Sequence, residues 1–191
     1  MDELQRLSTE EFHASHKSPI VVILENVRSM HNVGSVFRTC DAFRVEKICL
    51  CGYTPRPPHR DINKTALGAT ETVEWAGYED GLTAVAQLKE QGYSVYTIEQ
   101  VHNSISLESF NYQSGEKIAL VFGNEHAGVT DELRAFCDGN FIIPQMGIIQ
   151  SLNISVACAV SIYEAMRQKM NAGHYEKASL PQAQMETLLT Q

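Results

Sequence analysis

Three polar clusters, each following an apolar run, hold the residues best suited to chemistry. Residues 25–39, ENVRSMHNVGSVFRT, contain Asn32 and Arg38, and residues 121–128, VFGNEHAG, place Glu125 between two glycines. Residues 142–155, IIPQMGIIQSLNIS, form an apolar segment that ends in serine and asparagine. A guanidinium group partly surrounded by apolar side chains can stabilise negative charge that develops on a reacting oxygen. A glycine-flanked loop lets the backbone approach a bound ligand closely.

Each cluster also has a simpler structural interpretation. Arg38 lies among Val36, Phe37 and Cys40, so its stem could cover apolar surface while its head stays in water. Glu125 could be a solvated side chain in a tight turn. Either serine or asparagine in the third cluster could cap a helix, which is the usual role of these residue types. An apolar loop is nevertheless unusual on a surface, and it would fit against an aromatic ring such as adenine.

Several common nucleotide and metal sites are excluded by spacing. Gly123 and Gly128 have the separation of a phosphate-binding loop, but Val129 stands where that loop needs lysine. The chain has no GxGxxG or GxSxG pattern, and its five cysteines show no CxxC spacing. We therefore expect reduced thiols, no metal site and a cytoplasmic location. The acidic, polar first 17 residues predict no secretory signal, and no apolar run approaches the ~18 residues of a membrane span.

Charge is distributed unevenly along the chain. The net charge is -8, yet residues 21–60 carry six cations against three anions. Five of these six cations are arginines, and arginine matches the geometry of phosphate. The same pattern would also suit an ordinary solvated surface.

The alternation of apolar runs with amphipathic stretches predicts an α/β fold with a mainly parallel sheet flanked by helices. We expect strands at 20–24, 47–51, 93–98, 117–122 and 141–143, and helices at 33–43, 82–91, 131–136 and 153–169. Asn32 is the expected cap of the first of these helices, and residues 54–63, TPRPPHRDIN, are expected to be a loop. The length suits one domain at 17–170, with an added N-terminal helix at 1–16 and a C-terminal tail at 171–191. In parallel sheets, ligands bind at the carboxyl ends of the strands, where all three clusters begin.

Taken together, the clusters resemble motifs 1, 2 and 3 of the SpoU family of RNA 2'-O-ribose methyltransferases, in the SPOUT superfamily. The matching segments are residues 25–43, 119–129 and 143–165, and KTALGATETV at 64–73 is similar to the family's linking segment. The resemblance implies a deep C-terminal trefoil knot, one of the few exceptions to unthreaded chains. It also implies a homodimer with the active site near the interface and S-adenosylmethionine as the methyl donor.

The resemblance further implies roles for individual residues. The family's catalytic arginine falls on Arg38, and its polar companions fall on Asn32, Glu125, Ser151 and Asn153. Cofactor contacts fall on Gly123, Ile143, Met146, Ser151 and Leu152. Because an arginine pKa above ~12 makes deprotonation costly, we expect Arg38 to stabilise and position the 2'-oxygen and the neighbouring phosphate. The expected RNA surface near it comprises Arg28, His31, Arg56 and Arg60.

The chain departs from the family pattern at three positions. Arg44 stands where glycine is frequent and would either contact RNA or simply be exposed. Gln145 stands between Pro144 and Met146, where the family pattern has methionine directly after proline, and Gln150 replaces a frequent glutamate. The predicted activity is 2'-O-methylation of structured RNA, with tRNA favoured over rRNA and an accessory protein possible. The alternatives are a knotted RNA-binding or assembly protein without catalysis, and an unknotted flavodoxin-like nucleotide-binding domain.

Overall fold

A seven-stranded sheet organises the chain, in the order β3-β2-β1-β6-β4-β7-β5. The computed structural model describes residues 8–112, 116–149 and 151–171. The strands are β1 (Ser18–Glu25), β2 (Val45–Cys51), β3 (Trp75–Tyr78), β4 (Tyr93–Ile98), β5 (Ile105–Ser106), β6 (Lys117–Phe122) and β7 (Gly139–Ile142). Every pair of neighbouring strands in this sheet runs parallel. The expected α/β class and parallel sheet are thus confirmed.

The central strands explain the longest apolar runs in the sequence. β1 lies between β2 and β6, and all but one of its eight residues are buried. β6 is buried from its second residue onward. A strand covered on both faces reads as a continuous apolar run, so its sequence lacks the alternation of a half-exposed strand.

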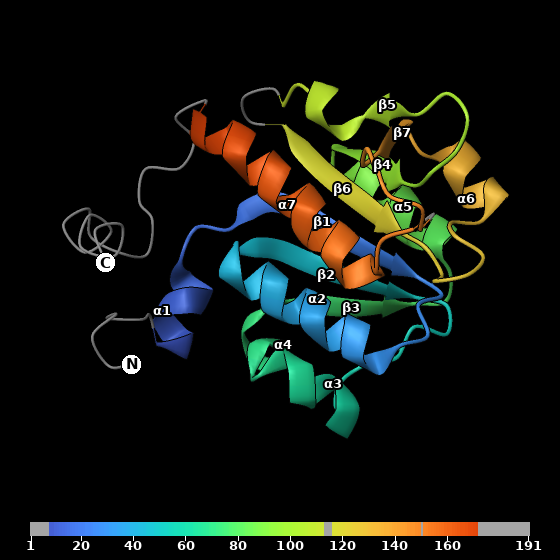
Figure 1. Cartoon of the computed structure of the whole chain (residues 1–191). Helices are drawn as coiled ribbons and strands as arrows, with labels where there is room; N and C mark the ends of the chain where they lie inside the picture. Colours follow the sequence, from blue (N-terminus) through green and yellow to red (C-terminus); the bar gives the residue numbers. More distant parts are fainter. Residues whose placement is uncertain (1–7, 113–115, 150, 172–191) are drawn as a thin grey trace.

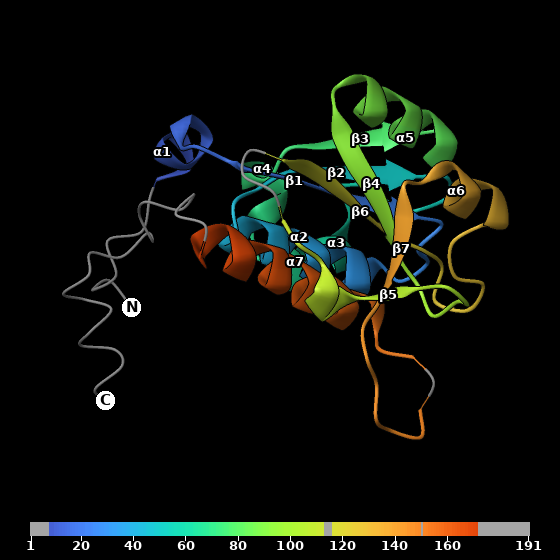
Figure 2. The same cartoon turned by 90° about the horizontal axis from the view of Figure 1, so that it is seen from above.

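Helices cover both faces of the sheet (Figures 1 and 2). On one face, a core joins the sheet to α2 (Met30–Ala42), α3 (Arg60–Ala66), α4 (Ala69–Thr72) and α7 (Ile154–Asn171). On the other face, a second core involves α5 (Gly81–Glu90) and α6 (Asp131–Phe136). The short α1 (Thr9–Ala14) buries Phe12, and His13 lies 3.2 Å from the carbonyl oxygen of Glu71 in α4. Nowhere in the described residues is there a helix with the length and apolar character needed to cross a bilayer.

The start of α2 corrects one expectation. Ser29, not Asn32, is the N-cap, and its hydroxyl oxygen accepts a hydrogen bond from the Asn32 backbone N–H at 3.3 Å. The Asn32 side chain is therefore free to make other contacts. Gly34 allows α3 to approach, since a Cβ there would lie 2.2 Å from both the Ile62 carbonyl oxygen and the Thr65 hydroxyl oxygen.

The expected loop at 54–63 is wrong over its last four residues, because α3 begins at Arg60. The prolines end at position 58, and the imidazole of His59 then caps the helix by accepting the Asp61 N–H at 3.2 Å. The short elements α4, β3, β5 and a 3-10 turn, η2 (Leu107–Ser109), lie in stretches that the sequence pattern left unassigned. The expected strands and the expected helices from residue 33 onward are confirmed, with ends that differ by up to three residues. The described part of the expected helix at 1–16 forms α1. Residues 1–7 and all of the expected tail except Asn171, the last residue of α7, lie outside the described residues.

Candidate active site

The first two polar clusters meet where neighbouring strands end. Leu24 of β1 pairs with Phe122 of β6, so residues 25–32 and 123–128 leave the sheet side by side. The start of α7 lies across the same end of α2 (Figure 1). Residues separated by about 100 positions are thus brought to one edge of the sheet.

The carboxylate of Glu125 organises this edge. It accepts hydrogen bonds from the backbone N–H of Arg28 and of Ser29, both at 3.0 Å. It also accepts one from the side-chain amide of Asn32 at 3.2 Å. Glu125 therefore holds the N-terminal end of α2 in place through hydrogen bonds. The alternative interpretation, a freely solvated glutamate, is wrong.

These contacts set the charge of Glu125. Partial burial raises the pKa of its carboxyl, but the hydrogen bonds from Arg28, Ser29 and Asn32 outweigh that effect, so the pKa lies below its usual value. The side chain is a carboxylate at neutral pH and can only accept hydrogen bonds. It suits a positioning role better than proton transfer.

Asn153 connects the third cluster to the other two. Its side-chain oxygen caps α7 by accepting hydrogen bonds from the Ser155 backbone N–H at 2.9 Å and hydroxyl at 2.7 Å. Its amide nitrogen donates to the side-chain oxygen of Asn32 at 3.1 Å. A continuous relay therefore runs from Asn153 through Asn32 to Glu125. The helix-cap interpretation of Asn153 is correct, and the residue has this second contact as well.

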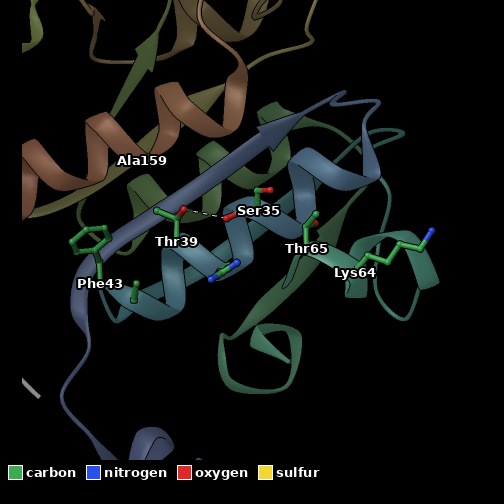
Figure 3. Close-up of a pocket in the computed structure, with 8 residues that line it drawn as sticks. Ser35, Thr39, Phe43, Lys64, Thr65 and Ala159 are labelled. Atoms are coloured by element: carbon green, nitrogen blue, oxygen red, sulfur yellow. Dashed lines mark hydrogen bonds between the residues drawn. The ribbon is translucent and has the colours of Figure 1, made fainter. Parts of the chain in front are cut away.

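Arg38 lies elsewhere on α2, roughly 9 Å further along the helix axis from Asn32. It is exposed, and it is not part of the hydrogen bonds that join Asn153, Asn32 and Glu125. Arg38 lines a pocket of about 480 Å³ together with Ser35, Thr39, Ala42, Phe43, Lys64, Thr65 and Ala159. Figure 3 shows the pocket residues coming from α2, α3 and α7, with the Lys64 amine directed away from the others.

The segment between β7 and α7 presents apolar side chains to solvent. Met146 is 95% exposed, Ile148 98% and Ile149 77%, and Figure 2 shows this connection projecting from the domain. Ile143 is half-buried at its start, and Leu152 is 38% exposed near its end. Such a run of uncovered apolar surface suits contact with an apolar or aromatic group.

Gly123 lies at the base of the adjacent loop. Asn124 and Gly128 form a two-way backbone bridge with N···O distances of 3.0 and 2.9 Å. A Cβ at Gly123 would lie 2.2 Å from the carbonyl carbon of Gly128, so only glycine lets this loop close. The carboxylate of Glu99 accepts the Val129 N–H at 2.9 Å and fixes the far side of the loop.

Comparison with known proteins decides the family. The model of the SpoU rRNA methylase family matches residues 19–163. The chain belongs to the SpoU rRNA methylase family. A tRNA (guanosine(18)-2'-O)-methyltransferase from Thermus thermophilus is 35% identical over 178 residues, which cover 93% of this chain and 90% of that protein. The resemblance inferred from the three motifs is confirmed.

Solved structures of SpoU proteins share the fold. The crystal structure of the TrmH/SpoU tRNA modifying enzyme of A. aeolicus has a TM-score of 0.76 and 27% identity, covering 95% of this chain and 90% of that one. An AdoMet-bound rRNA methyltransferase from Sinorhizobium meliloti has a TM-score of 0.74 and 26% identity, covering 82% of this chain and 59% of that one.

The expected RNA-binding residues of this SpoU protein are all exposed, but one of them is also hydrogen-bonded within the protein. Arg28, His31 and Arg60 are exposed. Arg56 is also exposed, but its guanidinium donates to the Tyr78 carbonyl oxygen at 2.7 Å and packs where a Cβ of Gly77 would lie. Arg56 therefore packs on the edge strand β3 and is hydrogen-bonded to it.

The structure adds site residues that the SpoU motifs did not single out. Ser29 caps α2, and the Asn124 side chain holds the motif 2 loop by accepting the N–H groups of His126 and Ala127, both at 2.9 Å. Asn124 also donates to the Asn26 carbonyl oxygen at 2.9 Å. An asparagine beside glycine is a turn-forming signal that could have indicated this role. Among the described residues, no group of three or more His, Cys, Asp or Glu side chains could hold a metal ion.

Proposed function

We propose that this chain transfers a methyl group from S-adenosylmethionine to a ribose 2'-hydroxyl of structured RNA, with tRNA preferred over rRNA. The observation that carries the proposal is the Asn153–Asn32–Glu125 relay, which joins the three SpoU motifs at one edge of the sheet. The tRNA preference rests on similarity to the Thermus tRNA enzyme over nearly the full length of both chains. We propose a cytoplasmic location on the same basis.

The cofactor site fits S-adenosylmethionine. An adenine ring would cover the exposed apolar segment at Met146. Backbone groups of Gly123, Ile143, Ser151 and Leu152 would bind its polar edges. When bound, S-adenosylmethionine supplies an electrophilic methyl group. The residues of the two loops bind and orient it, and the glycine-dependent closure at Gly123 fixes the loop that faces it.

The polar residues serve the nucleophile. The hydroxyl of ribose attacks as its proton passes to solvent water, and the Arg38 guanidinium stabilises the negative charge that develops on the oxygen. The same group can pair with the neighbouring phosphate. Asn32, Asn153 and the ionised Glu125 hold the start of α2 in place, and the exposed Ser151 hydroxyl is available to orient the ribose.

RNA would bind on the surface that carries the basic side chains of residues 21–60. Arg28, His31 and Arg60 provide exposed basic groups there, with a smaller contribution from Arg56. Binding should weaken with salt in proportion to the number of phosphates neutralised. An accessory protein could add to this surface.

The active form is a homodimer whose interface includes α7. Val156, Val160 and Tyr163 recur at helical spacing on α7 and are 46%, 39% and 59% exposed. The ring of Tyr163 meets that of Phe43, which lines the Arg38 pocket, so this apolar stripe borders the arginine. A second copy covering the stripe would bring the two active sites to the interface.

The C-terminal trefoil knot is part of the same proposal. So is the division into a helical extension at 1–16, a methyltransferase domain at 17–170 and a tail at 171–191.

The alternative is a SpoU protein that binds RNA or aids assembly without methylating. Purified protein incubated with radiolabelled S-adenosylmethionine and either unmodified total tRNA or rRNA separates the two. Digestion of the RNA to nucleosides should place label in a 2'-O-methylnucleoside, and an Arg38→Ala control should give about 100-fold less label or lower. RNA binding and cofactor binding without label would support the non-catalytic alternative.

A further inference from the structure

Tyr53 is a large aromatic side chain left uncovered beside the site. It lies in the turn after β2 and is 61% exposed. Its backbone N–H donates to the side-chain oxygen of Asn26 at 3.4 Å, and its phenol oxygen accepts a hydrogen bond from the Asn124 amide at 3.0 Å. Both polar ends of the residue are therefore held, while much of the residue remains in solvent.

The turn that carries Tyr53 is also fixed. Gly52 has a φ of +63°, and a Cβ there would lie 2.0 Å from the Asn26 side-chain oxygen. The Thr54 hydroxyl is buried, donates to the Leu24 carbonyl oxygen at 3.0 Å and accepts the Val27 N–H at 3.1 Å. A ring held on such a turn loses little conformational entropy when a ligand packs on it.

Tyr53 is connected directly to the motif 2 loop. Its partner Asn124 immediately precedes Glu125, whose carboxylate holds the backbone of Arg28 and Ser29. The Arg28 side chain is exposed, and residues 51–60, CGYTPRPPHR, contain two arginines and no acid. Basic side chains that can pair with RNA phosphates therefore lie near the ring in the chain, although the carboxylates of Glu125 and Asp80 lie at the same end of the sheet.

We propose that Tyr53 stacks against an unpaired base of the RNA, next to the ribose that is methylated. The inference rests on the proposed function for the presence of RNA. Single-stranded bases in RNA are commonly bound by stacking on aromatic rings combined with basic groups for the phosphates. Stacking uses the face of the ring, which leaves the phenol oxygen bonded to Asn124.

Two substitutions separate stacking from a structural role. Tyr53→Phe keeps the ring and removes the bond to Asn124, whereas Tyr53→Leu keeps apolar bulk and removes the aromatic face. Affinity for fluorescein-labelled, unmodified tRNA is measured by anisotropy at fixed salt, and affinity for S-adenosylmethionine by calorimetry. We expect about a tenfold loss of RNA affinity for Tyr53→Leu. Tyr53→Phe should stay within about twofold of wild type, with cofactor affinity unchanged in both.

Other outcomes overturn the stacking role. Equal losses in both variants, or weaker cofactor binding, would make Tyr53 a support for the motif 2 loop. Unchanged RNA affinity in Tyr53→Leu with an altered sedimentation coefficient would make the ring a protein contact. RNA binding by wild type without methyl transfer would contradict the proposed function alone, because the affinity comparison still judges stacking. No RNA binding by wild type would overturn both.

Discussion

The side-chain amide of Asn153 donates a 3.1 Å hydrogen bond to the side-chain oxygen of Asn32, 121 residues earlier in the chain. Asn32 in turn donates to Glu125 at 3.2 Å. The amide of Asn32 is thus used as both acceptor and donor, which the acceptor-only carboxylate of aspartate could not reproduce. The three motifs act as one hydrogen-bonded unit in this structure.

This unit predicts coupling between Asn32 and Asn153. Asn153→Ser keeps an oxygen that can cap α7 but cannot reach Asn32, so stability should change by less than about 1 kcal/mol. The rate of methyl transfer should fall by roughly tenfold or more in Asn153→Ser and in Asn32→Ala. Each variant removes the hydrogen bond between these side chains, which helps to fix the N-terminal end of α2. The kcat/KM of the double variant should be close to that of the less active single variant. Fully additive losses in kcat/KM would show that the two side chains act independently.

Arg38 should be needed for turnover and not for cofactor binding. Arg38→Ala should lower kcat by about 100-fold or more, since it removes the charge that stabilises the developing oxyanion. The Kd for S-adenosylmethionine should stay within about twofold. Arg134→Ala is the matched control, because Arg134 lies on α6 on the other face of the sheet and forms a surface ion pair with Asp131 within the described residues. Loss of both kcat and cofactor affinity in Arg38→Ala would instead indicate a structural arginine.

The sequence predicted the central strands of the sheet because they are encoded by long apolar runs. The runs at 20–24 and 117–122 are buried central strands, and a continuous apolar run has few other uses in a parallel sheet. The short elements had weaker signals: β5 has two residues, and α3 begins only two residues after a proline. Their positions depend on pairing and capping by distant or unusual partners such as the His59 imidazole.

The sequence indicated which residues lie together at the site, but it indicated their hydrogen-bond partners less well. Asn32, Glu125 and Asn153 were expected together and are hydrogen-bonded, but the cap of α2 was assigned to Asn32 and belongs to Ser29. A cap and a side-chain relay use the same polar residue types, so a sequence cannot separate them. The tie between Arg56 and the Tyr78 carbonyl oxygen depends on the absence of a side chain at Gly77, which only the packing of β3 shows.

Arg44 should be replaceable by glycine with a gain in stability. Its φ is +49°, a left-handed conformation that costs energy for residues with a side chain and that glycine adopts readily. Arg44→Gly should raise the free energy of unfolding by about 1 kcal/mol, and Arg44→Val should lower it. Urea unfolding measures both. The KM for RNA should not change if Arg44 is merely exposed, and it should rise if Arg44 contacts RNA. A loss of stability in Arg44→Gly would contradict the strain argument.

Lys169 should make stability depend on pH between about 8 and 10.5. Its side chain is 3% exposed, its amine donates to the Ser18 hydroxyl oxygen at 3.0 Å, and the Tyr112 ring centroid lies 5.0 Å away. Desolvation lowers the pKa of Lys169 from 10.5 to about 8, against the raising effect of the Glu46 charge. Between these values the unfolded chain binds the proton more strongly than the folded chain, so the contribution of Lys169 to stability rises with pH. Below about 8, both states are protonated and burial of the charge costs its full amount, roughly 3 kcal/mol.

Lys169→Met tests this sign directly. The variant should be more stable than wild type at pH 7, and its advantage should shrink steadily from pH 8 to pH 10.5. Urea unfolding of both proteins across that range isolates Lys169, because the tyrosines and cysteines that also titrate there are common to both. Lys117→Met, at an exposed lysine of β6, controls for the loss of one positive charge. A stability difference for Lys169→Met that stayed constant from pH 7 to pH 10.5 would show that the buried amine does not titrate as its surroundings require.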